Sequence, residues 1–348
     1  MEQSNALTYI KNSFLKDLLN DENITDISYN GQDLYYVHNL YGRRKADINI
    51  SLEQAKDFIR QIANISMKQF SFQNPLLDVS IEKYRINAVH QSIGRYLYQP
   101  VVTFSLRIGS EKILIDNKSF ITDEMYALLK ALLDNNISLV IGGKTGVGKT
   151  ELQKYLLSIM EDNTRVITID NVLELNNIPS NNLDLTTWQI DERFINNSIQ
   201  DMVKNALRNN PDWLIVAEAR GKEMLEILSS ALTGHSIITT IHALDIENMP
   251  NRIVSMIRMN DMKFSLDSLY KDIYHHLPIY IYLSKDIDQE GRVHRFIDSV
   301  MEITDDGEPN YLYQSTNKKY GKVSPSLAKR IKRNISPLFQ KTFLRQDK

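Results

Sequence analysis

The sequence predicts an α/β protein in which a domain with a mostly parallel sheet follows a smaller α+β domain. Short β-branched runs in the second half of the chain alternate with helical stretches, which is typical of a parallel sheet with helices on both faces. The chain has 348 residues, a length that suits two domains of ordinary size. We therefore expect two separate cores.

The composition is that of a globular protein, with 42% hydrophobic and 24% charged residues. The 41 Lys and Arg nearly balance the 43 Asp and Glu, so the molecule as a whole does not look like a polyanion binder. The absence of cysteine excludes disulfides and Cys-ligated zinc. Without a signal peptide or a run of ~18 to 20 apolar residues, we expect a cytoplasmic protein that meets a membrane only as a peripheral partner.

The first domain is expected over residues 1–108. One helical face is predicted near its start, formed by Ile10, Phe14, Leu15, Leu18 and Leu19. Residues 24–45 read as two strands around an Asn-Gly turn, and residues 51–66 as an amphipathic helix. Two further strands follow at 84–91 and 99–108. A polar, turn-rich segment, residues 109–120, is the predicted linker.

The second domain is expected over residues 121–310. A helix is predicted from the spacing of Met125, Leu128, Leu129, Leu132 and Leu133. The apolar run 137–141 predicts a strand, and a helix is expected from Lys149. Further strands are predicted at 164–169, 213–217 and 236–241, and a helix with a strand hairpin at 272–303. Residues 311–348 are rich in Lys and Arg and are predicted to form a basic tail.

A glycine-rich loop lies between the predicted strand 137–141 and the following helix. It fits the pattern G-x-x-x-x-G-K-[ST] and is formed by Gly143, Lys144, Thr145, Gly146, Val147, Gly148, Lys149 and Thr150, with Glu151 next in the chain. Glycines let backbone N–H groups surround a phosphate, the lysine neutralises β/γ oxygens, and the threonine hydroxyl suits Mg²⁺. We therefore predict binding of nucleotide phosphates and Mg²⁺, with Lys149 facing solvent when the site is empty, although the loop alone leaves the nucleotide open. The alternative is a purely structural turn.

Three later segments, residues 168–175, 207–221 and 231–243, resemble the Asp box, Walker B segment and His box of the secretion and pilus-assembly ATPases. That family serves type II and type IV secretion, conjugation and type IV pili. The resemblance extends from about residue 19 to about residue 303. It implies a RecA-like ATPase domain after a family-specific N-terminal domain.

The Walker B resemblance assigns a catalytic role to Glu218 and matches Arg220 to the family arginine. The family has G-E-x-R where this chain has Ala217 before Glu218. A carboxylate at the carboxyl end of a buried strand can orient or deprotonate the attacking water. Alternatively, Glu218 caps a helix that begins at Gly221.

The Asp box departs from the family pattern T-x-E-D-x-x-E. Asp170 keeps a carboxylate, Asn171 lacks a charge, and Glu174 is retained. We expect Asp170 and Glu174 to act in catalysis and Asp170 to bind the metal together with Thr150. Because the Asp box departs from the family pattern, we expect slower turnover. Asp170 and Asn171 could instead be turn formers.

The two histidines of the His box, His235 and His242, bracket the predicted strand 236–241. Their odd spacing places them on opposite faces of a regular strand, so only one would face the nucleotide directly. The resemblance implies phosphate sensing or coupling for at least one of them. The alternative is a structural role.

Arginines of the first domain are candidates for stabilising the transferring phosphate, because the loop lysine covers only part of its charge. The resemblance implies this role for Arg85 and Arg107, with Arg95 a weaker candidate. Each of these side chains could instead be merely solvated.

The resemblance implies a hexameric motor that couples ATP hydrolysis to interdomain movement and powers a secretion, conjugation or type IV pilus-like machine. Its partners would be its own copies and inner-membrane platform or coupling proteins, at the inner face of the cytoplasmic membrane. The basic tail could contact anionic lipid or nucleic acid, or be a solvated helix. One alternative is a nucleic-acid-translocating motor that engages DNA directly. Another is a nucleotide-gated scaffold that does not hydrolyse ATP.

Overall fold

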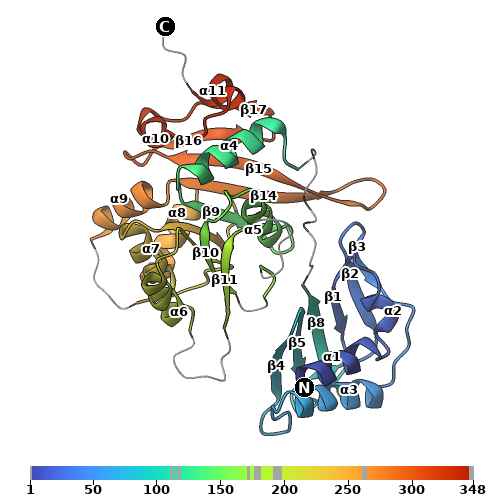
Figure 1. Cartoon of the computed structure of the whole chain (residues 1–348). Coiled ribbons are helices and arrows are strands. Elements are labelled where there is room, and N and C mark those ends of the chain that lie inside the picture. Colours follow the sequence, from blue (N-terminus) through green and yellow to red (C-terminus); the bar gives the residue numbers. More distant parts are fainter. Residues whose placement is uncertain are drawn as a thin grey trace. The chain divides into compact units, whose positions relative to one another are not determined.

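The computed structural model describes the chain except residue 1 and residues 110–112, 114, 116–117, 119, 171–172, 176–181, 191–197, 261–264 and 345–348, and except the side chains of residues 2–4. The chain forms two compact units. Unit 1 comprises Met1–Glu111, Val172–Glu174 and Asp286–His294, and unit 2 comprises Lys112–Asn171, Leu175–Lys285 and Arg295–Lys348. The fold is mixed α/β, as predicted, with one large sheet in each unit (Figure 1).

Unit 1 contains a six-stranded antiparallel sheet in the order β3-β2-β1-β8-β5-β4. Its strands are β1 (Ile24–Tyr29), β2 (Leu34–His38), β3 (Gly42–Lys45), β4 (Leu76–Ile81), β5 (Tyr84–Val89) and β8 (Thr103–Ile108). A small hairpin of β6 (Arg95–Tyr96) and β7 (Gln99–Pro100) precedes β8. Helix α3 (Leu52–Ile65) begins with a capping box between Ser51 and Gln54. Its apolar face, including Phe58 and Ile62, shares one core with the sheet.

The single helical face predicted at the start of the chain is divided between α1 (Glu2–Lys11) and α2 (Lys16–Leu19). The Ser13 hydroxyl donates to the Ile10 carbonyl at 2.7 Å and accepts from the Leu15 N–H at 3.2 Å. Such local bonds compete with the helical ladder and end the helix. Ile10 and Leu15 are nevertheless both buried in the core of unit 1.

Unit 2 contains a nine-stranded sheet in the order β11-β10-β12-β13-β9-β14-β15-β16-β17. The strands are β9 (Leu139–Gly143), β10 (Arg165–Asp170), β11 (Asp184–Gln189), β12 (Trp213–Val216), β13 (Ser236–Ile241), β14 (Ile279–Ile287), β15 (Val293–Ile303), β16 (Pro309–Gln314) and β17 (Lys319–Tyr320). The six from β11 to β14 are parallel, whereas β16 pairs antiparallel with β15 and β17. In the described part of the chain, no helix is both long and apolar enough to cross a bilayer.

Helices cover both faces of this sheet. They are α4 (Asp123–Asp134), α5 (Lys149–Ser158), α6 (Ile199–Ala206), the 3-10 turn η1 (Leu207–Asn209), α7 (Met224–Leu232), α8 (Met249–Ile257), α9 (Leu266–His276), α10 (Pro325–Arg330) and α11 (Pro337–Phe343). Leu139 and Ile141 of β9 belong to the core that contains α4 and α5, whereas Val140 belongs to the core of α6 to α9. This alternation is the period of two expected for a strand buried on both faces.

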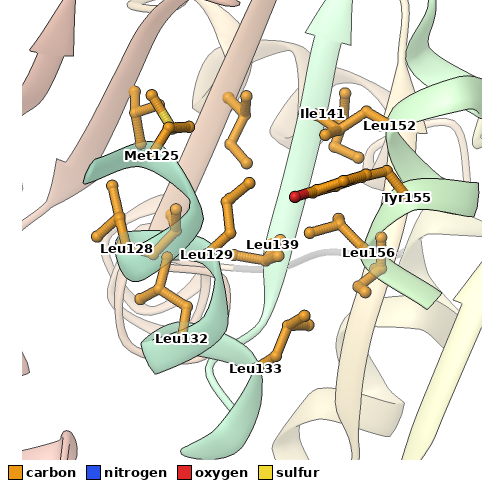
Figure 2. Packing of buried hydrophobic residues seen from close by; sticks show 14 of the residues in the cluster. Met125, Leu128, Leu129, Leu132, Leu133, Leu139, Ile141, Leu152, Tyr155 and Leu156 are labelled. Carbon is orange, nitrogen blue, oxygen red and sulfur yellow. The ribbon is translucent and has the colours of Figure 1, made fainter. Parts of the chain in front are cut away.

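The core beneath the glycine-rich loop is tightly packed (Figure 2). Leu128, Leu129 and Leu132 of α4 and Leu156 of α5 are fully buried beside β9. Each buried leucine side chain contributes roughly 1.5–3 kcal/mol relative to exposure. The strand that ends in the loop and the helix that starts from it are therefore fixed by the same core.

The C-terminal segment differs from the predicted basic tail over residues 311–348, because its described part is folded onto unit 2. Phe339 and Phe343 of α11 are fully buried, and α11 contacts α4. The Lys322 Nζ donates to the carbonyls of Lys341 and Thr342 at 2.9 and 2.8 Å, at the end of α11. The buried apolar residues thus hold this segment on unit 2, although its charges had suggested a solvated tail. Contact of these charges with lipid or nucleic acid stays a prediction.

Candidate nucleotide site

The glycine-rich loop joins β9 to α5 and depends on its glycines. Gly143, Gly146 and Gly148 have φ values of 147°, 75° and 98°, which side chains rarely adopt. A Cβ on Gly143 would also lie 2.7 Å from the Leu283 carbonyl oxygen. The loop conformation is therefore specified by these glycines, and Gly148 is the residue directly before the first turn of α5.

Lys149 lies across the loop and is buried, rather than facing solvent as the sequence analysis expected. Its Nζ donates to the carbonyls of Gly143 at 2.9 Å and Lys144 at 3.1 Å. It also lies 3.4 Å from His242 Nδ1. These loop carbonyls hold the ammonium, because a buried cation needs acceptors.

The turn after β12 places Glu218 at the carboxyl end of the parallel sheet. The Ala219 N–H donates to the Thr240 carbonyl at 2.8 Å, and the Thr240 hydroxyl donates to the Ala217 carbonyl at 2.7 Å. These bonds flank Glu218 and continue the pairing of β12 with β13. Ligands in open α/β sheets bind at this edge.

His242 lies between Glu218 and Lys149 because β13 lies between β12 and β9 in the sheet. His242 Nε2 is 2.8 Å from Glu218 Oε1. An ammonium can only donate, so the contact with Lys149 makes Nδ1 the acceptor and assigns the ring proton of a neutral His242 to Nε2. A continuous polar chain thus runs from the loop lysine to the carboxylate.

The Glu218 carboxylate also accepts a hydrogen bond from Arg220 at 2.8 Å, on Oε2. Burial raises the pKa of the Glu218 carboxyl. The hydrogen bond and charge of Arg220, with the charges of His242 and Lys149, outweigh burial and hold this pKa below its ordinary value. Oε1 is buried and lies 2.8 Å from His242 Nε2, and within the described structure no other donor contacts it. The group is an ionised carboxylate that can accept a proton.

The alternative that Glu218 caps a helix is wrong. Helix α7 starts at Met224, and the Glu223 carboxylate accepts from the N–H groups of Arg220 and Gly221. Glu223 therefore closes the turn, which leaves Glu218 for other contacts.

The Asp box is divided between the units. Asp170 is the buried last residue of β10 in unit 2, so it is a strand residue and not a turn former. Glu174 belongs to unit 1, where it lies 3.4 Å from the Arg107 Nε. Asn171 lies outside the described residues. The structure thus gives the two carboxylates different surroundings.

The oxygen groups of Thr150 and Asp170 suit Mg²⁺ chemically, but the sheet order does not favour one ion held by both. Thr150 lies in the first turn after β9, and β13 and β12 separate β9 from β10. Three strand spacings amount to roughly 14 Å between β9 and β10 themselves. Joint ligation of one ion by Thr150 and Asp170 stays a prediction, and we carry Thr150 forward as the direct ligand. No group of three or more metal-ligating side chains occurs among the described residues.

His235 lies at the other end of β13 from His242. Its Nδ1 is 3.1 Å from the Thr233 hydroxyl. Six strand residues lie between the histidines, so they are seven residue steps apart, which amounts to about 23 Å along an extended strand. The sequence analysis separated them by strand face, but the larger separation is along the strand.

The arginines of unit 1 already have partners there. Arg85 and Arg107 are opposite each other on β5 and β8. Arg85 donates to both carboxylate oxygens of Asp78, at 3.2 and 2.8 Å. Arg95 donates to the carbonyls of Gln91, Ser92 and Gly94, so it closes its own loop.

Two basic residues beside the glycine-rich loop were missed. The Lys285 Nζ donates to the Thr145 carbonyl at 3.3 Å, and the Arg295 Nε donates to the Gly146 carbonyl at 2.9 Å. Both lie on the β14–β15 hairpin, and no local sequence pattern distinguishes them from other strand cations.

A glycine-rich loop that opens a helix, with a carboxylate at the same edge of a parallel sheet, defines a P-loop nucleotide-binding domain. The family model for Type II/IV secretion system protein matches residues 96–274, and the chain belongs to this family. An uncharacterized protein of Bacillus anthracis is 30% identical over 301 residues, covering 82% of this chain and 66% of the relative. The chain thus spans less than two thirds of the length of this relative.

Two solved structures share the fold. The ATPase DotB of Legionella pneumophila has a TM-score of 0.60 and 19% identity, covering 83% of this chain and 79% of DotB. The pilus retraction motor PilT with bound ADP has a TM-score of 0.57 and 18% identity, covering 83% of this chain and 82% of PilT. At these identities the likeness concerns the fold alone.

Proposed function

We propose that this chain is an ATP-hydrolysing motor that works as a hexameric ring and powers a secretion, conjugation or type IV pilus-like machine. The observation that carries the proposal is the polar chain from Lys149 through His242 to Glu218 beside the glycine-rich loop. Family membership supports the secretion setting, and the structural neighbours include an ATPase and a pilus motor.

Nucleotide binding rests on the loop and Lys149. On arrival of ATP, the ammonium exchanges the carbonyls of Gly143 and Lys144 for β/γ-phosphate oxygens. The N-terminal end of α5 adds its partial positive charge, and the loop N–H groups donate to the phosphates. Glu151 in the first turn of α5 forms an ion pair with Lys154 at 2.8 Å, so its carboxylate is partly neutralised near the phosphates.

Hydrolysis rests on Glu218. As a water oxygen bonds to the γ-phosphorus and the bond to the bridging oxygen breaks, Glu218 takes the proton from that water. His242 orients the Glu218 carboxylate through Nε2 and contacts Lys149 through Nδ1, so it couples the lysine that binds phosphate to the carboxylate. When Mg²⁺ is bound, it neutralises charge on the β/γ oxygens, with Thr150 as the protein ligand. Asp170 and Glu174 support the reaction from outside the metal shell.

The last part of the proposal concerns the arginines of unit 1, the movement that hydrolysis drives, and the place where the ring acts. Arg85 and Arg107 stabilise the charge on the transferring phosphate, and hydrolysis drives movement between the two units. The ring acts on inner-membrane platform or coupling proteins, at the inner face of the cytoplasmic membrane.

Phosphate release from MgATP by the purified chain tests this proposal. We expect steady hydrolysis that added single- or double-stranded DNA does not stimulate. Hydrolysis that requires DNA, with a stimulation that falls as salt rises, would favour the motor that engages DNA directly. ATP binding without any phosphate release would favour the scaffold.

A further inference from the structure

The β14–β15 hairpin places two cations against the glycine-rich loop. The Lys285 Nζ donates to the Thr145 carbonyl at 3.3 Å, and the Arg295 Nε donates to the Gly146 carbonyl at 2.9 Å. These carbonyls belong to consecutive residues in the middle of the loop. The hairpin reaches them because β14 pairs with β9, the strand that leads into the loop.

The two side chains also follow the loop closely. A Cβ on Gly146 would lie 3.3 Å from the Lys285 Nζ, and one on Gly148 would lie 3.6 Å from the Arg295 Cδ. The first distance is tighter than most Cβ contacts, so glycine at position 146 gives Lys285 room at the backbone, whereas the second is an ordinary van der Waals distance. Together with the two hydrogen bonds, these distances place the cations beside consecutive peptide groups of the loop.

A trans peptide plane points its carbonyl and its N–H in opposite directions. No cis peptide bond occurs in the described chain. The carbonyl of Thr145 that faces Lys285 thus directs the N–H of Gly146 away from that cation. By the same geometry, Arg295 directs the N–H of Val147 away from the guanidinium.

We propose that Lys285 and Arg295 are positioning residues that orient the N–H groups of Gly146 and Val147 toward the phosphates of a bound nucleotide. The proposal rests on the proposed function, since it concerns the same loop. A cationic donor on each carbonyl polarises the peptide group and strengthens its N–H as a donor. The two residues act through the loop backbone and do not touch the reacting atoms.

The electrostatic surroundings agree with two cations packed against one loop. Burial lowers the pKa of the Arg295 guanidinium, and the Glu151 carboxylate opposes this effect. Burial lowers the pKa of Lys285, and the charge of Arg295 lowers it further. In the loop, both cations donate to peptide carbonyls.

The test replaces each cation with a neutral side chain of similar length, in Lys285→Met and Arg295→Met. Equilibrium titration with fluorescent ATP and ADP analogues measures affinity, and steady-state hydrolysis measures kcat and KM. We expect each variant to bind both nucleotides about tenfold more weakly, the effect of about one positioned hydrogen bond. We expect kcat at saturating ATP to change less than twofold, because the chemistry rests on Glu218.

The matched control is Arg292→Met, on the same hairpin, where Arg292 pairs with Asp288 and Glu290. It should leave both affinities unchanged. Arg295→Lys keeps a cation and should recover part of the affinity. Thermal unfolding at the wild-type temperature for all variants shows that the loss is local.

Two results would overturn the inference alone: unchanged affinities in both methionine variants, or a loss confined to the ATP analogue. The second would mean that the cations touch the γ-phosphate directly. A wild-type chain that binds neither analogue would overturn the proposed function itself and the inference with it.

Discussion

The charged residues at the sheet edge of unit 2 converge on one another, whereas the arginines of unit 1 pair with carboxylates of their own unit. Lys149, His242 and Glu218 form one chain of contacts at 3.4 and 2.8 Å. Arg85 and Arg107 pair instead with Asp78 and Glu174. The first arrangement already joins the loop lysine to the carboxylate, and the second must exchange partners before it can act on a phosphate.

The two ion pairs of unit 1 differ in exposure and geometry. The side chain of Arg107 is 50% exposed, but that of its partner Glu174 is only 12% exposed. Arg85 and Asp78 are 27% and 41% exposed, and their contact has two hydrogen bonds. Ion pairs open to solvent contribute only about 0–1 kcal/mol, but bidentate geometry can raise this contribution. A phosphate therefore has to outweigh the present ion pairs before either arginine can act on it.

The largest effect is expected from Lys149→Met. It removes the ammonium that exchanges loop carbonyls for phosphate oxygens, so ATP affinity should fall by about 10²-fold, as for a lost charge-assisted bond. Hydrolysis should be undetectable. Lys204→Met, which removes a cation paired with Glu226 at 3.3 Å, is the control and should bind ATP normally. Equal binding by both variants would reduce the loop to a structural turn.

A smaller effect is expected from His242→Ala, and the other end of β13 supplies its control. Loss of the imidazole removes the group that orients the Glu218 carboxylate and links it to Lys149. Turnover should therefore fall about tenfold, equivalent to about 1.4 kcal/mol. His235→Ala should remain within twofold of wild type because Thr233 is its neighbour. Steady-state rates of the two variants sharpen the comparison, and the opposite ranking would reject the role given to His242.

The smallest effect on binding is expected from the arginines of unit 1. Arg107→Ala and Arg85→Ala should lower kcat by about three- to tenfold while changing ATP affinity less, because the stabilised charge develops in the transition state. Asp78→Asn removes the charge that pairs with Arg85 but keeps the arginine, so it should not reproduce the loss. If kcat and affinity fell together, the arginines would serve binding alone, and if neither changed, unit 1 would take no part in the reaction.

The sequence was sufficient to predict that the glycine-rich loop, Glu218 and His242 lie at the same edge of the sheet in unit 2. The loop is contiguous in the chain, and Glu218 and His242 each follow a β-branched run whose carboxyl end must lie at the same edge of a parallel sheet. Strand order was not available, so the bridging place of His242 between Glu218 and Lys149 could not be predicted.

Lys285 and Arg295 could not be predicted, because their carbonyl partners lie 140 and 149 residues away in the chain. Strand β11 was missed because it is an edge strand, paired with β10 alone, and carries polar threonines instead of a buried run. The sequence of the C-terminal segment did contain a pattern that indicates a packed helix. Phe339 and Phe343 are spaced four residues apart, as on one helical face, but the charge of the segment outweighed them in the prediction.

Glu218→Gln tests the central claim most directly, because it keeps the shape of the side chain and removes its capacity to take a proton. We predict near-normal ATP affinity by equilibrium titration, and a single-turnover rate of phosphate release lower by at least ~10²-fold, the usual contribution of a general base. Glu226→Gln, which changes a carboxylate of α7 paired with Lys204, should hydrolyse ATP normally. Hydrolysis by Glu218→Gln at the wild-type rate would contradict the account, since the edge of the sheet would then lack its proposed base.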